Sequence, residues 1–183
     1  VTGVPTGYHK LDAMTAGMQP GDLVIIAARP SMGKTSFVMN MVVNAAMQKH
    51  KTEDGKERHP FPALVFSLEM SKESLCERLL CSEARVDSMK LRGGFLETKD
   101  WIRITTAAGN LSEAPILIDD SGSPTLLEIR AKARRWRSDN NLFYMGGEQM
   151  GVVVIDYLQL IQGRATKDDN RQREISEISR GLK

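Results

Sequence analysis

The feature that most restricts the fold of this chain is an apolar run followed directly by a glycine-lysine-threonine turn. Residues 23–27 read Leu-Val-Ile-Ile-Ala, and residues 28–35 continue Ala-Arg-Pro-Ser-Met-Gly-Lys-Thr before a segment with helical spacing of apolar residues. A near-continuous apolar run over 23–28 is typical of a strand buried on both faces. The order of strand, tight loop and helix therefore predicts an α/β fold.

The same loop has the composition of a phosphate-binding loop. Its backbone N–H groups and the positive end of the following helix would face an anion. Lys34 would then reach the β- and γ-phosphates of a nucleoside triphosphate, and the Thr35 hydroxyl would ligate Mg²⁺. The general pattern begins with glycine, whereas Ala28 can make this turn only with a negative φ. A surface loop that has this sequence by chance is the alternative.

Size and composition indicate one globular domain. The chain has 183 residues, of which 41% are hydrophobic and 26% are charged, and this is enough for a substantial core. No apolar run is long enough to span a bilayer, and the start shows no signal-peptide pattern, so no membrane role is expected. The net charge of +2 gives no argument for nucleic-acid binding. Cys76 and Cys81 lie about 140° apart around one predicted helix, so two free thiols and a cytoplasmic location are expected.

Strands are predicted to alternate with helices along the rest of the chain. After a helix over 37–47 and a polar insert interpreted as a surface loop, at 50–60, buried strands are predicted at Ala63–Ser67, Pro115–Ile118 and Val152–Ile155. Residues 1–22 are rich in turn residues. This alternation predicts a mostly parallel sheet with helices on both faces.

Local signals also predict where the helices begin and break. Ser71 is a candidate N-cap, Gly93-Gly94 separates short helices over 86–111, and Thr125 with Glu128 forms a capping box for a helix to Arg137. The last helical stripe stops at Lys183 with no strand after it. The fold is therefore expected to be C-terminally incomplete.

Two carboxylates and one arginine are candidates for chemistry beside the loop. Asp156 ends the predicted strand over 152–155, where it could hold Mg²⁺ or simply cap the next turn. Glu69 follows the strand over 63–67, where it could deprotonate a water or favour the helix dipole. Arg78 could join this network, or it could be a solvated helix residue.

Two basic segments could contact a polymer. Arg130, Arg134 and Arg137 lie on one face of the helix over 125–137, which is more typical of a solvated surface. The polar loop from Gln162 to Arg173 leaves the same predicted sheet edge as Asp156. It could touch a nucleic acid, and a plain surface loop fits its composition equally well.

Three motifs in order resemble the bacterial replicative DNA helicase of the DnaB type. They are Ala-Arg-Pro-Ser-Met-Gly-Lys-Thr at 28–35, Phe-Ser-Leu-Glu-Met at 66–70 and Ile-Asp-Tyr-Leu-Gln-Leu at 155–160. The segments at 4–7, 17–21 and 174–180 are similar as well. The resemblance covers the chain except the insert at 50–62 and the stretch at 145–150, and this family uses alanine at the position of Ala28.

The resemblance implies a RecA-like P-loop NTPase core over residues 1–183, an ATP-dependent helicase motor that uses ATP and Mg²⁺. Carried over by motif, Lys34 and Glu69 are catalytic, Arg78 belongs to the Glu69 motif, and Thr35 and Asp156 hold the metal. The implied nucleotide-binding residues are Arg29, Pro30, Ser31, Met32, Gly33, Lys34, Thr35 and Ser36.

The resemblance also implies partners and a location. The family forms a homohexamer around single-stranded DNA and works with a primase and a helicase loader at the replication fork in the cytoplasm. The family's glutamine-bearing strand, main DNA loop and arginine finger would lie beyond Lys183, and its N-terminal collar and linker helix are expected to be absent as well. This chain alone is therefore expected to be weakly active or inactive. The alternatives are a nucleotide-switched assembly or loader module and a small-molecule P-loop kinase.

Overall fold

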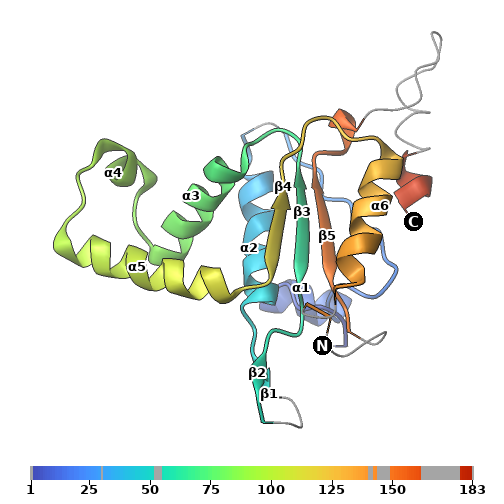
Figure 1. The fold of residues 1–183 in the computed structure, drawn as a ribbon, viewed down its shortest axis with the longest axis horizontal. Coiled ribbons are helices and arrows are strands. Elements are labelled where there is room, and N and C mark those ends of the chain that lie inside the picture. Colours follow the sequence, from blue (N-terminus) through green and yellow to red (C-terminus); the bar gives the residue numbers. More distant parts are fainter. Residues whose placement is uncertain are drawn as a thin grey trace.

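A parallel sheet of three strands lies at the centre of the computed structural model (Figure 1). The structure describes residues 2–29, 31–51, 55–139, 142–143, 149–161 and 178–182. Strand β3 (Ala63–Ser67) is central, with β4 (Ile116–Asp119) and β5 (Val152–Asp156) on its two sides. In this register, Ser67 at the end of β3 pairs with Asp156 at the end of β5. The three strands therefore deliver their last residues to one edge of the sheet.

Helices cover both faces of the sheet, as the alternation of the sequence predicts (Figure 1). Alternate residues of β3 point to opposite faces. Ala63 and Val65 pack with α2 (Lys34–Ala46) and α3 (Lys72–Ala84) in one buried cluster. Leu64 and Phe66 pack with α6 (Leu126–Arg137) in another. The strand is fully buried because each face has its own layer, which explains its continuous apolar sequence.

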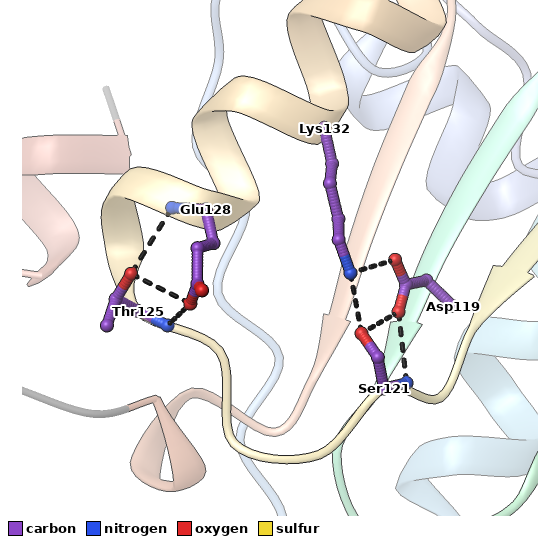
Figure 2. A network of polar contacts seen from close by, with 5 residues as sticks. All are labelled: Asp119, Ser121, Thr125, Glu128 and Lys132. Atoms are coloured by element: carbon purple, nitrogen blue, oxygen red, sulfur yellow. Dashed lines mark hydrogen bonds and ion pairs between the residues drawn. The ribbon is translucent and has the colours of Figure 1, made fainter.

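The helix boundaries that local signals predict are confirmed. The Ser71 hydroxyl accepts the Ser74 N–H at the start of α3. Thr125 and Glu128 form the expected capping box at the start of α6, which Figure 2 shows. Gly94 ends α4 (Ser88–Gly93) in the left-handed conformation. The following helix α5 (Thr98–Glu113) has 16 residues, so the prediction of only short helices in this region is wrong there.

The predicted strand at 23–28 is wrong in this structure. Residues 22–29 are in neither helix nor strand, and among the described residues no strand pairs with the outer edge of β5. Ile25 is 69% exposed and Val24 is 55% exposed. An apolar pattern shows which segment can be buried, but a strand also needs a neighbouring strand to pair with its backbone groups.

Two further elements differ from the sequence-based expectations. The insert at 50–60, interpreted as a loop, contains a short antiparallel hairpin of β1 (His50–Lys51) and β2 (Glu57–Arg58). The turn-rich start contains a helix, α1 (His9–Thr15). A 3-10 turn, η2 (Leu158–Leu160), follows β5. The polar loop at 162–173 lies outside the described residues, and so does most of the C-terminal helical stripe, of which 178–182 are helical.

Helices α3, α4 and α5 project from the β4 side of the sheet (Figure 1). Their own small core contains Ala84, Val86, Ile104 and Ala107. Both cysteines are free, as predicted, with Cys76 exposed and Cys81 buried. In the part of the chain that the structure describes, no helix has the length and apolar character that crossing a bilayer requires.

Candidate nucleotide-binding site

The loop before α2 has the backbone shape of an anion-binding turn. Gly33 lies just before the helix with a φ of 80°, a conformation that glycine adopts without strain, and Ser31 has a φ of 63°. A serine in this region is strained by about 1–2 kcal/mol, which is common at functional sites. No side chain caps the start of α2 at Gly33. Within the described residues, the first N–H groups of α2 therefore lack a side-chain partner, and an anion could serve as that partner.

Lys34, Thr35 and Asp156 meet at the carboxyl edge of the sheet. The Lys34 ammonium lies 3.3 Å from one carboxylate oxygen of Asp156. The Thr35 hydroxyl donates a 2.6 Å hydrogen bond to the other oxygen, across 121 residues of sequence. Asp156 is only 8% exposed. Burial makes this contact stronger than an ion pair on an open surface, because less water screens it.

The oxygen donors in this cluster suit Mg²⁺. This ion takes hard oxygen ligands and usually needs only one or two from the protein, since water and phosphate oxygens supply the others. The Thr35 hydroxyl and the Asp156 carboxylate already lie within hydrogen-bonding distance of each other. Among the described residues, no group of three His, Cys, Asp or Glu side chains could hold a metal by itself. Thr35 and Asp156 therefore fit a metal ion that binds together with a nucleotide.

Tyr157 is a member of this cluster that sequence reasoning missed. Its ring centroid lies 4.6 Å from the Lys34 ammonium, which is close enough for a cation–π contact. Tyr157 directly follows Asp156, but no local pattern indicates that an aromatic residue at this position would contact a lysine far away in the sequence. Only the meeting of β5 with α2 reveals the contact.

Glu69 lies at the same edge, in the turn between β3 and α3. It comes two residues after Ser67, which pairs with Asp156 in the sheet. The Leu68 N–H donates a 2.8 Å hydrogen bond to the Asp156 carbonyl, so the turn begins against β5. The Glu69 side chain is exposed, and within the described residues it has no hydrogen bond or ion pair. This carboxylate is therefore not occupied by a structural contact with any described residue.

The structure also gives the positions of the other residues that the sequence predicts for this site. Arg78 is exposed on α3, about 9 Å along the helix axis from its start, and the structure shows no contact between it and Glu69 or Asp156. The other predicted loop residues that the structure describes, all of them exposed, are Arg29, Ser31, Met32, Gly33 and Ser36. Pro30 lies outside the described residues.

Comparison with known proteins gives consistent matches over the whole chain. A family model described as the DnaB-like helicase C terminal domain matches residues 3–183. The chain is 45% identical to the replicative DNA helicase DnaB of Geobacillus stearothermophilus, covering 100% of this chain and 36% of that protein. It is 46% identical to the replicative DNA helicase DnaC of Bacillus subtilis (strain 168), with the same coverage. The chain thus spans about a third of the length of these curated relatives.

Two solved structures share the fold. One of them, an ATPase domain, superposes with a TM-score of 0.82 at 32% identity, covering 98% of this chain and 58% of that one. A DnaB-like replicative helicase, studied with its interactions with primase, gives a TM-score of 0.79 at 32% identity, covering 98% of this chain and 39% of that one. The RecA-like α/β fold that the sequence predicts is thereby confirmed. Because the family model covers nearly all of the chain, and the relatives match it along its length, this chain belongs to the family of DnaB-like helicase C-terminal domains.

Proposed function

We propose that residues 1–183 form the ATP-hydrolysing motor domain of a replicative DNA helicase. The observation that carries this proposal is the meeting of Lys34 and Thr35 with Asp156 at the carboxyl edge of the sheet. Parallel α/β sheets bind their ligands at this edge. A lysine, a hydroxyl and a carboxylate around the start of one helix match the groups that a magnesium-bound triphosphate needs.

The first step in this mechanism is binding of the triphosphate by the loop at 29–36. Its backbone N–H groups and the start of α2 hold the phosphates. Lys34 exchanges its contact with Asp156 for the β- and γ-phosphates, and the phosphate charge replaces the carboxylate as its partner. Thr35 and Asp156 would hold Mg²⁺, which neutralises charge on the phosphate oxygens when it is bound.

The second step is hydrolysis, in which Glu69 serves as the general base. Its carboxylate accepts a proton from a water whose oxygen attacks the γ-phosphorus, and the bond to the bridging oxygen of ADP breaks. Two observations support this assignment: Glu69 lies at the same edge as Asp156, and its carboxylate has no partner among the described residues. Arg78 is assigned to this motif by the resemblance to the DnaB family.

The polymer and protein partners are proposed on the basis of the family resemblance. We assign single-stranded DNA as the track, a homohexamer as the working assembly, and a primase and a helicase loader as partners at the replication fork in the cytoplasm. A DnaB-like relative has been studied with its interactions with primase. Contacts with the DNA backbone need little base readout, so each cycle of hydrolysis can advance the strand whatever its sequence.

The test is the rate of ATP hydrolysis by the full-length protein with and without single-stranded DNA. We expect the DNA to raise the rate. Lys34→Ala is expected to weaken ATP binding at least about tenfold, because it removes a charge-assisted contact with the phosphates. Lys49→Ala is the matched control, since Lys49 pairs with Glu113 on an exposed surface away from the site.

The second variant separates binding from chemistry. Glu69→Gln is expected to keep nucleotide binding and to lower turnover by about a hundredfold or more. Glu73→Gln, at an exposed position in the first turn of α3, is the control. Transfer of phosphate to a metabolite, with no DNA effect, would instead identify a kinase. Nucleotide binding without any turnover in the wild-type protein would identify a switch.

A further inference from the structure

The turn that carries Glu69 is held at both ends by neighbouring strands. At its start, the Leu68 N–H donates to the Asp156 carbonyl at the end of β5, at 2.8 Å. At its end, the Lys72 N–H donates to the Asp120 carboxylate just after β4, at 3.0 Å. Inside the turn, the Ser67 hydroxyl donates to the Met70 carbonyl at 2.6 Å. Glu69 therefore lies in a short bridge between two fixed points.

The residues on either side of Asp120 belong to the network drawn in Figure 2. The preceding Asp119 forms a 2.6 Å ion pair with Lys132 on α6 and accepts a 3.0 Å hydrogen bond from the Ser121 N–H. The Ser121 hydroxyl also contacts Asp119 and accepts from the Lys132 ammonium. Burial alone would raise the pKa of Asp119, but the hydrogen bonds from Lys132 and Ser121 outweigh it and lower that pKa. The turn over 119–121 is thus tied to α6.

The contact between Asp120 and Lys72 is more than a helix cap. Helix α3 already has a local cap, because the Ser71 hydroxyl accepts the Ser74 N–H. The Asp120 contact instead spans 48 residues and joins the end of β4 to the turn that follows β3. A long-range contact of this kind fixes the position of the turn relative to the sheet, which a local cap cannot do.

We propose that Asp120 is a positioning residue for Glu69, acting through the backbone of Lys72. This proposal rests on the assignment of Glu69 as the general base. A base must lie within hydrogen-bonding distance of its water, and a displacement of about 1 Å can lower a rate about a hundredfold. Asp120 does not contact the cluster of Lys34, Thr35 and Asp156. Removal of the Asp120 carboxylate is therefore expected to lower turnover and to leave the affinity for nucleotide unchanged.

The experiment compares variants of Asp120 in the full-length protein under steady-state ATP hydrolysis. Asp120→Ala is expected to lower kcat about tenfold with KM changed less than about twofold. Asp120→Asn keeps an acceptor oxygen and is expected to restore most of kcat. The matched control is Asp87→Ala, because Asp87 accepts the Met89 N–H at the start of α4, away from the site. Ser67→Ala is a second variant of the same turn and is expected to lower kcat without raising KM.

A double-mutant cycle with Glu69→Gln decides whether Asp120 acts through Glu69. If it does, adding Asp120→Ala to Glu69→Gln lowers kcat no further. Three results would overturn the proposal: an unchanged kcat in both Asp120→Ala and Ser67→Ala, an equal loss in Asp87→Ala, or a full further loss on top of Glu69→Gln. An active wild type with an active Glu69→Gln would instead refute the role of Glu69 itself.

Discussion

The effect on stability of replacing Asp12, on α1, can be predicted in the most detail from the structure. It is 8% exposed and accepts three hydrogen bonds, from the Thr6 N–H at 2.8 Å, the Thr6 hydroxyl at 2.7 Å and the Gly7 N–H at 3.2 Å. The Thr6 carbonyl in turn accepts a hydrogen bond from Asn44 on α2 at 3.1 Å. Asp12 therefore helps to fasten the start of the chain to the helix that carries Lys34.

The size of the effect follows from the donors that Asp12→Ala would leave without partners. Thr6 is 1% exposed, so water cannot replace the lost acceptor at its N–H. A buried donor without a partner costs about 1–3 kcal/mol, and Gly7, near the edge of the cluster, adds less. We expect a loss of about 2–3 kcal/mol in the free energy of unfolding. For a domain of this size that corresponds to a decrease of about 5–10 °C in Tm.

The assay is urea denaturation, with Asp22→Ala as the control. Asp22 is exposed, and its side chain has no hydrogen bond or ion pair within the described residues, so its removal should change stability little. A loss below about 0.5 kcal/mol in Asp12→Ala, within the range of an ordinary surface change, would refute the reasoning.

The pH dependence gives a second check on the same variant. Burial alone would raise the pKa of Asp12, but the hydrogen bonds from Thr6 and Gly7 outweigh it and lower that pKa. A carboxylate with a lowered folded pKa stabilises the protein above its unfolded pKa of about 3.9, and this contribution is lost as pH falls through the folded value. The stability difference between wild type and Asp12→Ala should be full at pH 7 and should shrink below about pH 4. A difference that stays constant down to pH 3 would contradict the assignment.

Three further substitutions test local features of the fold. Thr125→Ala removes the capping hydroxyl of α6 and is expected to lower the free energy of unfolding by about 1 kcal/mol in urea denaturation. Gly151→Ala places a methyl group within 2.9 Å of Trp136 and is expected to lower Tm, with a loss of about 1–3 kcal/mol. Gly109→Ala lies on α5 with no atom within 4 Å of the new methyl group, and is expected to raise stability by about 0.5–1 kcal/mol.

Each of these predictions has an outcome that contradicts it. Ser123→Ala, on the exposed loop before α6, is the control for Thr125, and an equal loss in both would show that capping is not the cause. The two glycine variants add the same group at sites with opposite surroundings. A change of the same sign in both would mean that the free space around the methyl group does not decide the effect.

The parts of the fold that the sequence predicts correctly depend on neighbours in the chain. The apolar run that becomes β3 is easy to recognise, because a strand covered on both faces must be apolar throughout. The apolar runs of β4 and β5 also predict their strands correctly, but the expected full burial is wrong there, since Leu117 is 52% exposed and Val153 is 43% exposed. The cap at Ser71 and the capping box at Thr125 involve residues three apart, so composition is enough to find them. The hairpin of β1 and β2 and the helix α1 were missed, because elements of two to seven residues are too short to show a clear period.

The candidate site was predictable only in part. Lys34, Thr35 and Asp156 could be named because each stands at a fixed place relative to a strand or helix end. Tyr157 could not, since its contact with Lys34 depends on how β5 and α2 approach each other. The incorrect prediction of a strand at 23–28 has a related cause. Its apolar sequence meets one requirement of a strand, and the pairing partner that is also required comes from elsewhere in the fold.

The sequence alone therefore determined the alternation of strands and helices, the candidate phosphate-binding loop at 28–35 and the identity of the charged residues that follow it. The tertiary structure decided which of these residues meet. The contact of Thr35 with Asp156 spans 121 residues, and that of Lys72 with Asp120 spans 48. Such contacts are set by strand order and register, which place the ends of β3, β4 and β5 at one edge. Local sequence patterns carry no signal for that order, because it results from packing both faces of the sheet at once.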